Sequence, residues 1–163
     1  MSTVEFVALA VWIGGLIVIV ASVIPAVFNS FGMEPGGRFL TRVFQGYNRL
    51  LVVAAGALLV TLLLRHLVPM LKGVARVGRA ELVVTLVMVA VAGLIVFVLE
   101  PNSVKLQEEA FAVKDEAARK AAYAAFFKSH NLVRALYVVI LALAVALIPI
   151  KLKYWMNVKG ATR

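Results

Sequence analysis

The sequence contains no cysteine and only two histidines. The first absence excludes a disulfide framework, a thiolate metal site and a cysteine nucleophile. Acidic residues are also few, at 8 against 17 Lys and Arg, which gives a formal net charge of +9. In a strongly apolar chain such an excess is typical of helix ends beside anionic lipid head groups, so we expect no nucleic-acid partner.

Long hydrophobic runs bounded by charged residues dominate the 163-residue chain. It is 63% hydrophobic, whereas a soluble domain is roughly half apolar. A membrane-spanning helix needs about 20 mostly apolar residues. The runs predict an all-α membrane protein with four transmembrane helices in an up-down bundle, forming one integral membrane domain over residues 1–163. The expected spans cover residues 4–28, 47–68, 81–99 and 132–150.

The segment 102–129 is the longest stretch outside the expected spans. It is rich in alanine, and the pairs Asp115/Arg119 and Glu116/Lys120 are spaced to stabilise a helix. We therefore expect an amphipathic helix that lies on the membrane or joins the fourth span.

The distribution of basic residues sets the expected orientation. An even number of spans places both termini on one side of the membrane. That side also holds the basic connection from Arg65 to Arg79 and the basic tail that follows residue 150. Short basic segments near helix ends favour the cytoplasm, so both termini are predicted to be cytoplasmic.

The expected spans are nearly free of ionisable groups near their centres, which argues against a pump or a proton-coupled transporter. Arg49 and Arg65 bracket only 15 uncharged residues. We expect both side chains to extend outward to the membrane surfaces, or the second helix to lie where the bilayer is locally thin.

Polar residues gather instead at the span ends opposite the termini. A Glu100–Arg134 or Glu100–Arg49 ion pair would be natural there. Two interpretations stay open for these polar residues: they tie the helix ends together, or they bind a lipid head group, a small anionic ligand or a partner. This interface polar cluster comprises Arg49, Glu100, Asn102, Lys128, His130 and Arg134.

The first span carries small residues at Ala10, Gly14 and Gly15. Small residues four apart let two helix backbones approach closely, so these positions predict a helix-packing notch.

Neither histidine forms part of a recognisable metal or catalytic motif. His66 and His130 are expected on opposite membrane faces, about 30 Å apart, so they cannot both ligate one haem in a monomer. His130 alone stays a weak candidate for cofactor binding. We predict no catalytic residue, no metal site and no cofactor, with haem as the alternative.

Several single residues together resemble a known family. They are Trp12, Gly14-Gly15, Pro25 and Phe28, then Gly37-Arg38, Phe44 and Tyr47, then Pro101-Asn102 and Phe127. The pattern resembles that of bacterial proteins that contain a domain of unknown function and are related to transmembrane protein 205. The resemblance implies a four-helix bundle in the bacterial inner membrane. Haem-dependent protoporphyrinogen oxidases share the Trp and Gly, but here Ala8, Leu9 and Ala10 replace their histidine ahead of the Trp.

These features predict a non-catalytic integral membrane protein that acts through helix–helix contacts. The leading hypothesis is an accessory or structural subunit of a larger membrane complex, or a self-associating protein. A haem- or quinone-linked oxidoreductase using His130, and an oligomeric small-molecule or lipid transporter, are the alternatives.

Overall fold

The computed structural model describes residues 3–67 and 77–160, without the side chains of residues 154–160. Throughout these residues the regular structure is helical. The elements are α1 (Thr3–Val18), η1 (Ile19–Val23), α2 (Ile24–Phe31), α3 (Met33–Leu67), α4 (Arg79–Leu94), η2 (Ile95–Leu99), α5 (Glu100–Ala112) and α6 (Glu116–Gly160), where η marks a π-helical turn.

Four continuous helical segments are long and apolar enough to cross a membrane, which confirms the prediction of an all-α chain with four such helices. They are Thr3–Phe31, Met33–Leu67, Arg79–Ala112 and Glu116–Lys153. Only 22–28% of the most apolar window of each segment is buried within the chain. The remaining apolar surface faces outward, where hydrocarbon or another apolar protein surface must cover it.

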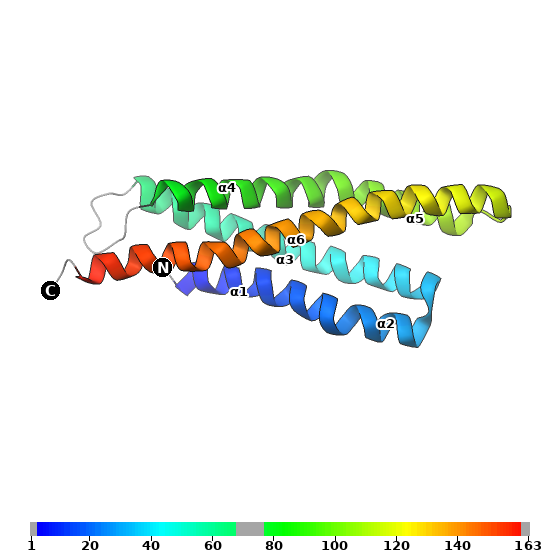
Figure 1. Ribbon diagram of the computed structural model, residues 1–163, viewed down its shortest axis with the longest axis horizontal. Helices are drawn as coiled ribbons and strands as arrows, with labels where there is room; N and C mark the ends of the chain where they lie inside the picture. The colour runs from blue at the N-terminus through cyan, green and yellow to red at the C-terminus, as the bar shows by residue number, and fades with distance from the viewer. Residues whose placement is uncertain (1–2, 68–76, 161–163) are drawn as a thin grey trace.

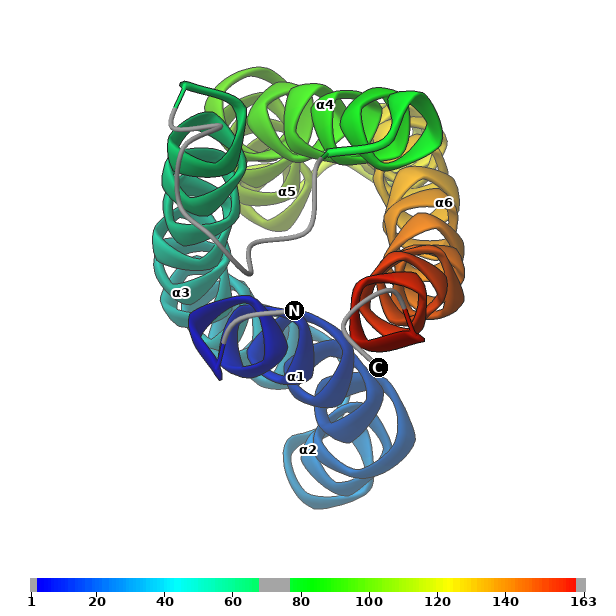
Figure 2. The same cartoon turned by 90° about the vertical axis from the view of Figure 1, so that its left-hand side faces the viewer.

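The four segments form a ring when viewed along the long axis (Figure 2). Each packs on the next along the chain, and α6 closes the ring against α1. The two chain ends lie at the same end of the molecule (Figure 1). At the other end α2 projects out of the ring, away from α6 (Figures 1 and 2).

Two of the segments contain a π-helical turn immediately before a proline. The N–H of Ile24 bonds to the carbonyl of Ile19, and that of Glu100 bonds to Ile95, five residues earlier in each case. Proline removes a donor and crowds the carbonyl four residues before it, so a widened turn accommodates Pro25 and Pro101. The helix therefore continues past residue 99, the expected end of the third span, as far as Ala112.

The segment 102–129 is not one helix. α5 ends at Ala112, Val113 is extended, and α6 begins at Glu116, so the segment forms a helical hairpin. Asp115, expected to pair with Arg119, instead accepts a 2.8 Å hydrogen bond from the N–H of Ala118. An acidic N-cap satisfies a helix donor that otherwise has no partner, and this starts α6.

Gly32 alone separates α2 from α3. Its φ of 74° lies in the left-handed region, which glycine adopts without strain. The chain reverses there, so α2 and the first half of α3 form a second hairpin.

A cluster of four charged side chains joins the segments at the end that holds the termini. Arg65 Nη1 donates to Glu5 Oε1 at 2.9 Å and to Glu81 Oε1 at 2.6 Å. Lys151 Nζ contacts the same two oxygens, each at 2.6 Å. Each segment contributes one residue, and the two acids balance the two bases. We call Glu5, Arg65, Glu81 and Lys151 the terminal charge cluster.

The terminal charge cluster corrects one expectation from the sequence. Arg65 does not extend outward, since its side chain is 12% exposed, and the acids and Lys151 are buried as well. A buried charge is tolerated when opposite charges surround it, and here each cation contacts both carboxylates. Both acids lie in the first turn of their helices and Arg65 lies in the last turn of α3, an arrangement that the helix dipoles also favour.

We predict that Lys151→Met lowers the free energy of unfolding by about 3 to 5 kcal/mol, because it removes one cation from two buried carboxylates. Thermal unfolding in detergent, followed by circular dichroism, measures the effect. Lys153→Met is the matched control, since Lys153 is exposed two residues further on. Equal melting temperatures for the two variants would contradict a stabilising role for the cluster.

Candidate functional site: a cleft between two helical hairpins

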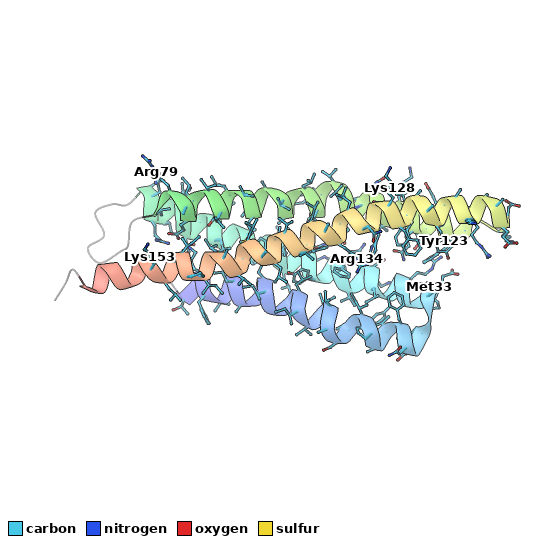
Figure 3. The ribbon with its side chains drawn as sticks, in the orientation of Figure 1. Met33, Arg79, Tyr123, Lys128, Arg134 and Lys153 are labelled. Carbon is cyan, nitrogen blue, oxygen red and sulfur yellow. The ribbon has the colours of Figure 1, made fainter. Side chains whose placement is uncertain are left out.

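A cleft of about 690 Å³ lies in the half of the molecule away from the termini. Its volume is within the range of about 300 to 1,000 Å³ that is typical of small-molecule sites. The α1–α2–α3 side forms one wall and the α5–α6 hairpin forms the other. Met33 on α3 and Tyr123 and Arg134 on α6 lie in this half (Figure 3). Apolar side chains make most of the lining, including Leu16, Val20, Phe28, Phe111, Phe126 and Phe127.

The cleft is closed on one side and open on the other. α3 and α5 are joined by the Arg38–Glu108 ion pair at 2.6 Å and by the hydrogen bond that Thr41 donates to Gln107 Oε1 at 2.9 Å. On the opposite side, Val20 on the first segment lines the cleft yet is 54% exposed. Val138 on α6 also lines it and is 66% exposed. A ligand could therefore enter sideways between the first segment and α6.

The position of Glu100 sets the depth of the cleft. Nineteen residues separate it from Glu81, which at the helical rise is roughly 28 Å, close to the hydrocarbon thickness of a bilayer. With the terminal charge cluster at one membrane surface, Glu100 would lie near the other. The two hairpins would then extend past that surface, and the cleft would straddle it.

A layer of polar side chains crosses the bundle at the level of Glu100. Tyr137 Oη donates to Asn48 Oδ1 at 2.7 Å, and Asn48 Nδ2 donates to the carboxylate of Glu100. Tyr47 Oη donates to the carbonyl of Trp12 at 2.7 Å. These bonds hold parts of all four segments in register where the two hairpins begin.

One face of α5 carries a polar stripe, Glu100, Ser103 and Gln107, at helical spacing. Ser103 shares a 2.7 Å hydrogen bond with Ser129 on α6. Ser103 and Gln107 are buried, and all three residues line the cleft. Glu100 Oε1 and Gln107 Nε2 are nevertheless buried atoms without a hydrogen-bond partner. Glu100 Oε1 is thus an unused acceptor in the lining of the cleft, whereas Gln107 Nε2 lies against α3, 3.2 Å from the position of a Cβ added to Gly37.

The structure divides the interface polar cluster expected from the sequence. Glu100, His130 and Arg134 line the cleft together. Arg49 lines a second cavity, of about 500 Å³, which Glu100 also borders. Asn102 and Lys128 are exposed and line neither cavity.

Neither expected ion pair of Glu100, with Arg134 or with Arg49, forms among the described residues. The carboxylate is held by the Asn48 amide instead, because that side chain points into the bundle from α3 at the same level. Gln107 and Tyr137 were not singled out from the sequence. Gln107 follows Glu100 by seven residues, and this spacing was a signal that both face one way.

His130 lies with its ring stacked on Phe126, at 5.4 Å between centroids. Among the residues that the structure describes, no group of three or more His, Asp or Glu side chains could hold a metal ion. Cofactor binding at His130 stays a prediction.

The small residues of the first span are not equivalent. Ala10 is exposed, and a Cβ added to Gly14 would meet no atom within 4 Å. A Cβ on Gly15, however, would lie 2.8 Å from Cε2 of Tyr47. The close approach of α1 to α3 therefore occurs at Gly15, beside the hydrogen bond between Tyr47 and Trp12.

We predict that Gly15→Ala destabilises the protein, because the new methyl group displaces the Tyr47 ring from its hydrogen bond. Gly14→Ala should leave stability unchanged or raise it by up to about 1 kcal/mol, since alanine favours helix. Thermal unfolding of the two variants side by side tests this, and an equal or larger loss for Gly14→Ala would refute it.

Comparison with known proteins adds a family. A family model described as a domain of unknown function, DUF4149, matches residues 7–112. No curated protein and no solved structure matches this chain. The matched range contains three of the four segments and the α5 side of the cleft, including Glu100 and Gln107. Because the match covers well over half of its length, the chain belongs to the DUF4149 family of uncharacterised domains.

Proposed function

We propose that this integral membrane protein binds an amphipathic, lipid-like molecule in the cleft between its two hairpins. The observation that carries the proposal is the cleft itself, a cavity with mostly apolar walls whose lining includes a carboxylate oxygen of Glu100 without a partner. Apolar walls suit hydrocarbon chains, and a few fixed polar groups suit a head group.

The apolar walls of the cleft follow the two hairpins away from the ring of four segments. Aromatic side chains of the α5–α6 hairpin, among them Phe111 and Phe126, face the first hairpin across the cleft. At the level of the lipid head groups such a surface is costly to hydrate, and an acyl chain drawn into the cleft would cover it. The lateral opening beside Val138 would let the rest of the molecule stay in the bilayer.

The polar end of the cleft gives the bound molecule an orientation. Arg134 lines the cleft, is exposed, and has no carboxylate partner in the described part of the chain. A buried polar atom without a partner costs about 1 to 3 kcal/mol, so a head group that donates to Glu100 gains affinity. We propose binding without chemistry, and therefore no catalytic residue and no resident cofactor.

The wider setting is part of the same proposal. The segments would cross a bacterial inner membrane in an up-down arrangement with both termini in the cytoplasm. Kinship with transmembrane protein 205 is also part of the proposal, and it rests on the residue pattern that includes Trp12 and Tyr47.

An accessory role in a larger complex is the second candidate. It is favoured by the outward-facing apolar surface of all four segments and by a lateral cleft that could also seat a partner helix. In this case we expect extraction in mild detergent to give a particle much larger than 17.6 kDa plus its micelle. Size-exclusion chromatography with light scattering measures it, and a monomer that retains lipid binding would exclude the subunit role.

We predict that Ala21→Trp, which fills the cleft from the first segment, weakens lipid binding at least about tenfold, because the indole occupies the space for a chain. The measurement is titration of the purified protein with a fluorescent single-chain phospholipid. The control is Ala90→Trp, an equal change at an exposed position of α4 that does not line the cleft. Equal affinities for the two variants would refute binding in the cleft.

A further inference from the structure

The two unpartnered atoms in the cleft specify opposite hydrogen-bonding needs. Glu100 Oε1 can only accept from a donor if the group is a carboxylate, and Gln107 Nε2 can only donate. Gln107 is 7% exposed, and its Oε1 is already used by Thr41. A head group bound beside Glu100 would therefore need a donor for its carboxylate. Gln107 Nε2 lies about two helical turns further along α5 and faces Gly37 of α3.

The cationic side of the cleft lies close to the same level. The hydrogen bond between Ser103 and Ser129 fixes the register of α5 against α6. Since these helices run in opposite directions, Glu100 lies across from positions one turn after Ser129, between His130 and Arg134. The cleft thus presents a carboxylate and a guanidinium within about one helical turn of each other, without an ion pair between them.

We propose that the cleft selects a zwitterionic phospholipid whose head group carries a primary amine, with the ammonium on Glu100 and the phosphate on Arg134. This inference rests on the proposed function and names the ligand class of the same site. A guanidinium donates to phosphate oxygens. A primary ammonium has N–H groups to give Glu100 Oε1, whereas a quaternary ammonium has none.

The presence or absence of these N–H groups distinguishes two head groups of equal net charge. Phosphatidylethanolamine can donate to Glu100, but phosphatidylcholine can only approach it as a bulky charge. Hydrogen bonds to charged groups are the stronger kind, so their loss should be measurable as affinity. An anionic lipid such as phosphatidylglycerol would place no positive charge on Glu100.

The test is native mass spectrometry of the full-length protein in detergent, titrated with these three lipids carrying identical acyl chains. We expect phosphatidylethanolamine to bind about tenfold more tightly than phosphatidylcholine. Glu100→Gln should bring the two affinities within about twofold, and Arg134→Gln should weaken both zwitterionic lipids alike. Glu109→Gln, the same change at an exposed position of α5, should leave the preference intact.

The outcomes separate the head-group assignment from the binding proposal beneath it. Equal wild-type binding of the two zwitterionic lipids, tighter binding of phosphatidylglycerol, or a preference that survives Glu100→Gln would overturn the assignment. If the wild-type protein binds none of the three lipids, or if Ala21→Trp leaves lipid binding unchanged, the cleft is not a lipid site. The wild-type comparison needs no variant, so a misfolded Glu100→Gln protein would not prevent a result.

Discussion

Four buried charges hold one end of this molecule together, and the rest of the structure depends on that junction. Glu5 and Glu81 are each contacted by both Arg65 and Lys151, so every membrane-spanning segment is tied to two of the others. Strongly apolar helices have little hydrophobic reason to associate inside lipid, because hydrocarbon is as apolar as they are. A neutral set of ionic contacts, in which every group has its partners, supplies the specificity that apolar surfaces lack.

At the opposite end of the molecule the two helical hairpins diverge. Widened turns before Pro25 and Pro101 let two segments continue past the points where proline would stop a regular helix. Each continuation then turns back as a hairpin, one at Gly32 and the other between Ala112 and Glu116. Because contacts join the hairpins mainly through α3 and α5, the space between α2 and α6 stays open. The cleft follows from this asymmetry. The four segments are joined at one end of the bundle, whereas at the other end the hairpins are joined along one side only.

The polar layer around Asn48 lies between the terminal charge cluster and the two diverging hairpins. Its amide links Glu100 to Tyr137, so three segments meet just where the cleft begins. This leaves half of the Glu100 carboxylate satisfied by the protein and half without a partner. Such partial satisfaction is common at binding sites, because a ligand can complete what the fold leaves undone. The lipid-binding proposal and its head-group assignment follow from that arrangement.

Hydropathy in the sequence was sufficient to determine the class of the protein and the number of its spans. Each apolar run must cross hydrocarbon as a helix, whatever its neighbours, since no other backbone partner is available there. It was also sufficient to bring Glu100, His130 and Arg134 to one end of the bundle, because that follows from counting crossings.

Only the tertiary structure decided which way the polar side chains face. Arg65 was expected to reach outward and instead turns inward, because two carboxylates from other segments lie at its level. Glu100 was expected to meet an arginine and instead meets Asn48. Both outcomes depend on the rotation and register of neighbouring helices, and a chain of nearly uniform apolar runs carries little periodic signal from which to read them. The cleft likewise could not be found from the sequence, because it exists only between hairpins whose divergence is set by two π-helical turns and one glycine.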